Sequence, residues 1–343
     1  MKFGSIFPLG TIAISISLLP ISLARAEENL YGKLNLSLVN TSVNESDEWK
    51  LNSNASRIGF TGKRSLSDKL LIHYSAEFEI YADDGNKTTK NTICSQSVNG
   101  DESCLVGSDK TTFSQRNITI GIGSNLGKLW AGKRDTPTKV AQTKIDLFND
   151  LEGDIKNTFE GENRVSNMIG ITTSRLNGLE ATLVVVPGEG NDANGDGIDH
   201  GGLADGVGYS LNYTGDNIYL AIAGDKEIDN QDLLRLVARY RIDALTLGFM
   251  HQKNNDNGGT LDEKGSFLST SFTIGNTVLK AQYGRVTGND SKEEETVSMG
   301  ADYKITKDTK FYGFYTENRD FDGSNDKQQA IGIGIGIGIE QKF

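Results

Sequence analysis

Residues 331–343 read IGIGIGIGIEQKF, so isoleucine alternates with glycine until the chain stops on Phe343. A period of two is typical of a β-strand, because successive side chains point to opposite faces of a sheet. Inside a bilayer every backbone N–H and C=O must be paired, so a spanning sheet must close on itself, with apolar side chains outward and small or polar ones inward. We therefore expect the isoleucines and Phe343 to face lipid and the glycines to face the interior of a barrel.

The same period recurs along the chain, which argues against an isolated amyloid-like or low-complexity repeat at its end. Leucines alternate with polar residues from Leu30 to Leu38, and apolar residues alternate with polar ones from Ile72 to Ile80. Each such segment is about ten residues long, as a tilted transmembrane strand requires. About sixteen strands are expected, near residues 29–38, 56–64, 72–80, 113–123, 127–134, 164–173, 179–187, 206–214, 217–224, 232–241, 244–253, 265–275, 277–287, 295–304, 309–317 and 328–343.

The connections between these segments alternate in length. A soluble sandwich has no reason to sort its loops in this way, whereas a membrane barrel has tight periplasmic turns on one rim and longer extracellular loops on the other. The predicted fold is therefore all-β, a transmembrane antiparallel β-barrel. Short links rich in turn-forming residues fall at 65–68, 124–126, 174–178, 214–216, 241–243, 275–276 and 306–308. Long polar loops fall at 40–54, 83–112, 135–163, 188–205, 226–231, 254–264, 288–294 and 318–327.

Residues 1–26 have the layout of a cleaved signal peptide. Lys2 supplies a basic start, residues 12–23 supply an apolar run, and an A-x-A-like cleavage site ends at Ala26. A retained anchor is the less favoured interpretation, because the run is shorter than the roughly 18 to 20 residues of a spanning helix. We expect an exported protein with one domain, the barrel of residues 27–343.

Charge and cysteine content narrow the partners. Cleavage would remove Lys2 and Arg25 but no acid, so the net charge would move from −11 to −13. An acidic chain is unsuited to nucleic acid, which requires a basic surface, and a mild preference for cations is expected instead. Cys94 and Cys104 are the only cysteines, and in an exported protein a close pair predicts a disulfide. A metal site there is less favoured, because no histidine or third cysteine is near.

Five features in this order resemble the general diffusion porins of Gram-negative outer membranes, and they cover essentially the whole chain after residue 26. The resemblance implies a trimer of sixteen-stranded barrels in outer-membrane lipid, open to small hydrophilic solutes and ions and without a cofactor. The terminal Phe343 resembles the family's signal to the barrel-assembly machinery. The features are NLYGKLNLSL at 29–38, SRIGFTGKRSLSDKL at 56–70, RNITIGIGSNLGKLWAGKRD at 116–135, ENRVSNMIGITTSRLNGLEATLVV at 162–185 and the aromatic carboxyl terminus.

The resemblance also implies that the loop of residues 135–163 folds back into the barrel and narrows it. In that family, acids on this loop face basic residues on the wall, and the resulting field sorts solutes. Matched motif by motif, the basic side is Lys33, Arg57, Arg116 and Arg164. The candidates for the acidic side are Asp146, Asp150, Glu152 and Asp154.

Strand alternation tests the basic set independently. Lys33, Arg57 and Arg164 have the parity opposite to their apolar neighbours, which predicts that they point into the lumen and oppose the cation preference. Arg116 shares its parity with Ile118 and would face lipid unless a bulge shifts the register. The alternative for each of the four is a solvated charge at the rim.

Other functions are less favoured. Asp192, Asn194 and Asp196 have the spacing of a calcium loop, but Leu203 stands where an EF-hand needs glutamate, so an exposed loop without metal is expected. None of the three histidines lies in a nucleophile motif, so we expect no enzyme. A solute-specific channel stays open as an alternative, with a barrel enzyme or an adhesin behind it.

Overall fold

The protein is described by a computed structural model over residues 27–43, 46–84, 87–96, 102–188, 201–256, 262–289, 293–321 and 330–342. Strands dominate these ranges, and no helix within them is long and apolar enough to cross a membrane. Strands β5, β6 and β19 are described by their backbone alone. The strands are β1 (Glu27–Val43), β2 (Ser46–Ser53), β3 (Arg57–Ser67), β4 (Leu70–Ile80), β5 (Lys87–Gln96), β6 (Glu102–Thr111), β7 (Phe113–Ser124), β8 (Gly127–Asp135), β9 (Arg164–Thr173), β10 (Leu179–Val186), β11 (Gly206–Thr214), β12 (Ile218–Ile228), β13 (Gln231–Ile242), β14 (Leu245–Asp256), β15 (Asp262–Ile274), β16 (Thr277–Thr287), β17 (Glu293–Lys304), β18 (Thr309–Phe321) and β19 (Ala330–Lys342).

Antiparallel pairing joins the main sheet into a ring. Strands that follow one another are neighbours, except that β4 pairs with β7 because β5 and β6 lie outside this sheet. The last strand, β19, pairs with β1 from Lys33↔Lys342 to Ser42↔Ile333. On its other edge β1 pairs with β2 through its second half and with β3 through its first half. Strands β2 and β3 are thus one crossing, broken at Ala55, whose φ is +48°. With β2 and β3 counted once, the 17-stranded sheet has the sixteen crossings that the sequence predicts.

Two expected loops contain more regular structure than the sequence indicates. In the loop expected at 40–54, β1 runs on to Val43 and β2 begins at Ser46. In the loop expected at 83–112, β5 and β6 pair as a separate two-stranded sheet. Polar residues on both faces hide the alternation in β5 and β6, but threonine and valine still favour a hairpin.

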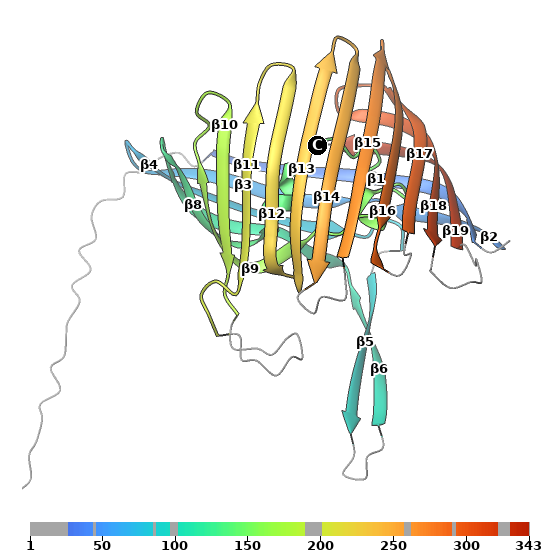
Figure 1. The fold of residues 1–343 in the computed structure, drawn as a ribbon, viewed down its shortest axis with the longest axis horizontal. Coiled ribbons are helices and arrows are strands. Elements are labelled where there is room, and N and C mark those ends of the chain that lie inside the picture. The colour runs from blue at the N-terminus through green and yellow to red at the C-terminus, as the bar shows by residue number, and fades with distance from the viewer. Residues whose placement is uncertain are drawn as a thin grey trace, which may run out of the picture.

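The two rims of the barrel differ as predicted (Figure 1). The tight links, such as Ile242 to Leu245 and Ile274 to Thr277, lie at the upper end in this view. The longer connections, including the one between β10 and β11, leave the lower end. We take the upper rim as periplasmic and the lower rim as extracellular.

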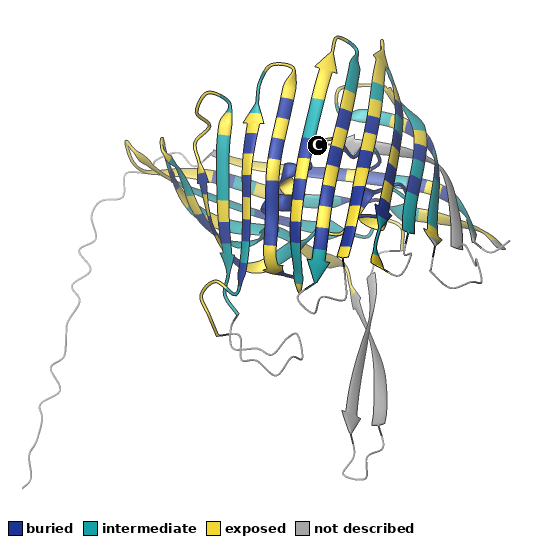
Figure 2. Ribbon diagram, in the orientation of Figure 1, coloured by how far each residue is buried: buried dark blue, intermediate teal, exposed yellow. Residues whose placement is uncertain are grey.

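Burial alternates along the strands, as the banding in Figure 2 shows. On β1, Leu34 and Leu38 are exposed on the outer face, whereas Lys33, Asn35 and Ser37, which alternate with the leucines, are buried inside. The outer face is therefore apolar and the lumen polar, the reverse of a soluble protein. The glycines and isoleucines of residues 331–339, predicted to divide between the two faces, have no described side chains, although Ile337 stands opposite Leu38 in the register.

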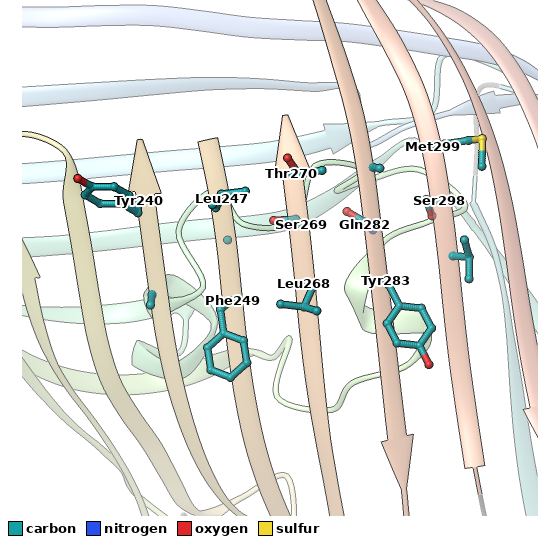
Figure 3. Close-up of a pocket in the computed structure, with 14 residues that line it drawn as sticks. Tyr240, Leu247, Phe249, Leu268, Ser269, Thr270, Gln282, Tyr283, Ser298 and Met299 are labelled. Carbon is teal, nitrogen blue, oxygen red and sulfur yellow. The ribbon is translucent and has the colours of Figure 1, made fainter. Parts of the chain in front are cut away.

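The outer face also carries an apolar groove of about 620 Å³ across β13 to β17 (Figure 3). Tyr240, Phe249, Leu268 and Tyr283 line it, and each of these side chains is exposed. In water such a surface would be costly, because exposed apolar area is unfavourable by roughly 25 cal/mol per Å². A hydrocarbon surrounding removes that cost.

The segment between β8 and β9 folds into the lumen, as predicted. It contains helix α1 (Pro137–Ala141) and a 3₁₀ turn, η1 (Ile155–Asn157). Ala141, Ile145, Ile155 and Phe159 are buried against the inner faces of β12 to β16. A second cluster packs Phe148 of the segment against Val39, Tyr312 and Phe314. We call residues 136–163 the constriction loop.

Candidate functional site

Local sequence starts and shapes the constriction loop. Thr136 caps α1 by accepting a hydrogen bond from Lys139 N at 3.3 Å, and Pro137 occupies the first turn, where its missing N–H is harmless. Asp154 caps η1 by accepting from Lys156 N at 3.0 Å and also accepts from Asp150 N at 2.8 Å. These side-chain oxygens accept from backbone N–H groups that have no partner in a regular helix, and so they stabilise the two turns.

One arginine fastens both ends of the loop to the wall. Arg235 on β13 is fully buried and donates to the Glu162 carboxylate at 2.7 Å, the Thr138 carbonyl at 3.3 Å and the Glu160 carbonyl at 2.8 Å. Its Nε donates to Gln252 of β14 at 2.8 Å. A guanidinium suits this task because its donors form a rigid planar fork. The beginning and end of the loop are thereby held at the same place.

The middle of the loop is held by β16 and β18. Lys280 donates to the Leu147 carbonyl at 3.0 Å, and its ammonium lies 4.6 Å from the centre of the Phe148 ring. Asn318 donates to the Glu152 carbonyl at 2.9 Å. The loop therefore follows the inner wall and leaves the lumen open on the side of β3 to β9.

Asp150 is the acidic residue of the loop that contacts the basic residues of the opposite wall. Its carboxylate lies 2.8 Å from Lys33 Nζ and 3.9 Å from Arg57 Nη1, and its backbone has a φ of +68°, in the left-handed region. Burial alone would raise the pKa of Asp150, but the charges of Lys33, Arg57 and Arg116 outweigh burial and lower it. The carboxylate is thus ionised at neutral pH, and the contact weakens only when the pH falls below the ordinary carboxyl range.

The wall facing the loop carries both signs of charge. Arg116 pairs with Glu77 at 2.8 Å and with Glu79 at 2.9 Å. Arg57 lies 3.7 Å from Glu77, which also accepts from the Tyr31 hydroxyl at 3.0 Å. On the adjoining side, Arg164 pairs with Asp135 at 2.9 Å. Each wall arginine is therefore close to an acid on the wall itself, and Arg57 also lies near the loop acid Asp150.

Loop and wall enclose an opening of about 530 Å³, which we call the eyelet. Its charged residues are five cations and six acids, so the charge is nearly balanced within one small space. Such a passage can carry hydrated solutes through a strong local field. Among the described residues, no group of three His, Cys, Asp or Glu side chains could hold a metal ion. The cations are Arg57, Arg116, Lys139, Lys156 and Arg164, and the acids are Glu77, Glu79, Asp135, Asp150, Asp154 and Glu162.

Comparison with known proteins decides the family. Residues 15–323 match the family described as Gram-negative porin. The chain belongs to this family. It is therefore an outer-membrane β-barrel channel through which solutes diffuse passively.

Solved structures agree with this assignment in fold. The anion-selective porin from Comamonas acidovorans superposes with a TM-score of 0.70 at 19% identity, covering 93% of this chain and 100% of that one. OmpF of Salmonella typhi in complex with daunomycin gives 0.66 at 14% identity, with 92% and 97% coverage. The trimer form of OmpT from Vibrio cholerae gives 0.63 at 14%, with 93% and 99%. No curated protein sequence matches the chain.

Of the four basic residues expected in the constriction, Arg57, Arg116 and Arg164 line the eyelet, and Lys33 contacts Asp150 beside it. Lys33, Arg57 and Arg164 point inward, as their parity predicts. Arg116 also points inward, because the pairing of β4 with β7 shifts register between Ala76 and Phe78. This shift is the bulge that the sequence required and did not locate.

The four acidic candidates lie in different environments, and only some of them border the eyelet. Asp150 meets the basic residues, and Glu152 accepts from Asn52 at 3.0 Å. Asp154 borders the eyelet but is largely buried by capping η1. Asp146 lies inside the loop, where it accepts from the backbone N–H groups of Phe148 and Ile155, and burial and the nearby Asp154 raise its pKa. It braces the loop and does not line the eyelet.

The sequence reading missed the wall acids and the loop's main anchor. The alternation in Glu77-Phe78-Glu79 carried a usable signal, since both acids have lumen parity on β4. Arg235 likewise has lumen parity between Leu234 and Leu236, but its partners could not be read from sequence. Phe343, the calcium-like Asp192 to Asp196 and the thiols of Cys94 and Cys104 lie outside the described part of the porin.

Replacing Asp150 by asparagine should increase anion permeation. The change frees Lys33 and Arg57 from the loop and removes one of the six eyelet acids. The anion-to-cation permeability ratio should therefore rise by about two- to threefold, because one charge in the eyelet changes the energy of a passing ion by roughly 1 kT. Reversal potentials in a KCl gradient measure it. Asp216→Asn makes the same change on an exposed periplasmic turn and should leave the ratio unchanged; equal shifts in both variants would contradict the assignment.

Proposed function

We propose that this porin is a general pore for small hydrophilic solutes and ions, without preference for one molecule. The observation that supports this is the pairing within the eyelet, where the arginines of the wall bind acids of the wall. A specific site would instead present several unpaired groups converging on one ligand. None of the residues described as lining the eyelet is aromatic, so a stacking track for sugars is not part of it.

Single-channel recording in a planar bilayer tests the proposal. In molar salt we expect ohmic steps whose size changes with added small sugars only as far as the viscosity of the solution changes. Saturable block by one sugar or one amino acid would make the porin a solute-specific channel instead. Absence of any conductance from heat-modifiable, folded protein would overturn the assignment of a pore.

We also propose that three copies assemble in the outer membrane, delivered by the barrel-assembly machinery through Phe343. The trimer form of the OmpT structure and the apolar outer wall support this. Steps that close in threes would be expected, and migration as a monomer after gentle extraction would count against a trimer. Deletion of Phe343 should reduce the amount of assembled barrel, and unchanged assembly would refute that role.

Two proposals concern processing. Cleavage after Ala26 would leave Glu27 as the first residue, which is also where β1 begins, and amino-terminal sequencing of the exported protein tests it. A disulfide between Cys94 and Cys104 is supported by the backbone register, which sets the two residues opposite each other on β5 and β6. Opposed residues of an antiparallel pair are about 4.5 to 5.5 Å apart at Cα, within disulfide range. Two titratable thiols in denatured, unreduced protein would disprove it.

The proposed transport requires neither cofactor nor catalysis. Two of the histidines have described positions: His73 lies on the wall of the lumen, and His251 contacts Ser266 at 2.9 Å on the lipid-facing side. Nucleophilic catalysis needs a base oriented by a third group inside an enclosed cleft, and among the described residues no third group is bonded to His251. Hydrolysis of ester substrates by the purified porin would contradict this.

A further inference from the structure

The periplasmic half of the lumen has a charge distribution unlike that of the eyelet. Lys63 on β3 and Lys128 on β8 both lie near the periplasmic turns, with His73 of β4 between them. Arg134 of β8 extends the set towards the eyelet, with its guanidinium 4.7 Å from the centre of the Trp130 ring. We call Lys63, Lys128 and Arg134 the periplasmic cations.

The strand register places these side chains on one inner surface. Lys63 stands opposite His73 in the pairing of β3 with β4. The His73 ring lies over Gly123, the residue opposite Lys128 in the pairing of β7 with β8. A side chain at Gly123 would occupy the space of this ring. Lys128 and Trp130 point to the same side of β8, and the guanidinium of Arg134 lies over the Trp130 ring, so the periplasmic cations face one stretch of the inner wall.

The periplasmic cations differ from the arginines of the eyelet in having no carboxylate at ion-pair distance among the described side chains. One acid, Glu27, stands opposite Lys63 in the pairing of β1 with β3, but the structure does not describe its side chain. Asp135 acts on Arg134, and Glu180 acts on both Arg134 and Lys128. Each of these acids is already within 4 Å of another cation: Asp135 lies 2.9 Å from Arg164, and Glu180 lies 3.7 Å from Arg175. In the eyelet, by contrast, a single arginine, Arg116, has two carboxylate partners within 3 Å, Glu77 and Glu79. Unpaired positive charge is thus concentrated on the periplasmic side.

We propose that the periplasmic cations form a binding site for small multivalent anions, such as phosphates or di- and tricarboxylates, on the periplasmic side of the eyelet. Three like charges held together on a wall repel one another, and an anion with several charges relieves that repulsion. The low-dielectric wall of the lumen strengthens the field at this point. The inference deepens the proposed general pore and rests on it: neutral solutes pass freely, whereas multivalent anions pause at the site.

The site predicts resolved block by a multivalent anion. Inorganic triphosphate is the probe, added at millimolar concentration while single channels are recorded in KCl. We expect brief current interruptions whose frequency depends on the sign of the voltage, because the site is off centre. In the variant Lys63→Gln/Lys128→Gln/Arg134→Gln, the half-blocking concentration should rise by at least tenfold, and the anion-to-cation permeability ratio should fall.

Two further variants test whether the block depends on these three charges in particular. Arg64→Gln/Lys69→Gln/Lys307→Gln removes the same charge at the same end of the barrel but outside the lumen, and should keep block as in the unmodified porin. Arg57→Gln in the eyelet should change block less than the triple variant of the periplasmic cations. Unchanged block in that triple variant, loss of block in the outer triple variant, or absence of block in the unmodified porin each overturns the site. Absence of conductance steps in every variant would instead remove the pore function itself.

Discussion

Replacement of Arg235 by methionine is expected to detach the constriction loop from the wall. The change removes the donors to Glu162, Thr138 and Glu160 together and leaves the Glu162 carboxylate without its buried partner. Loss of one member of a buried ion pair costs about 3–5 kcal/mol. Single-channel conductance and open-channel noise should both rise, because the loop no longer narrows the lumen.

A double variant distinguishes loss of the anchor from general damage. Arg235→Met/Glu162→Gln removes the unpaired carboxylate, so about half of the stability lost in urea unfolding should return. The conductance should remain high, since the loop is still unfastened. Arg175→Met, on an exposed periplasmic turn, is the control for losing an arginine without loop contacts. Unchanged conductance in Arg235→Met would show that the loop is held by its apolar contacts alone.

A valine at Gly132 is expected to prevent assembly of the barrel. Gly132 has a φ of +135°, which side chains disfavour, and a Cβ there would meet the backbone of Ile118 and Thr119 on the neighbouring strand. The residue sits at the register shift between β8 and β9. A strand that moves away to make room leaves unpaired backbone groups in the membrane, each costing several kcal/mol. The heat-modifiable folded form should therefore be lost.

Gly275 provides the matched control. Its φ is also positive, at +56°, but a Cβ there meets nothing within 4 Å. Asparagine adopts this conformation readily, so Gly275→Asn should assemble in the normal amount. Folded Gly132→Val in wild-type yield, seen by the same gel shift, would mean that β7 and β8 can separate locally without loss of the barrel.

The contrast between Glu77 and Arg235 shows how far the site could be read from sequence. Parity assigns both residues to the lumen, because a strand of period two leaves only two choices. For Glu77 that is nearly enough, since Arg57 has lumen parity on the neighbouring strand β3 and lies 3.7 Å from it. For Arg235 it is not, since three of its partners lie 73 to 97 residues away, on a loop that folds inward only in the complete barrel.

By itself, the sequence determined the closed β-barrel, its sixteen crossings, the sorting of short and long connections and the inward direction of Lys33, Arg57 and Arg164. These features follow from local alternation and from the need to pair every backbone group in hydrocarbon. Tertiary structure alone decided the inward turn of Arg116, the burial of Asp146 and the separation of a balanced eyelet from the periplasmic cations. Each of these depends on the strand register and on which strands are paired. The residues next to a side chain in the sequence do not indicate which residue it contacts across the lumen.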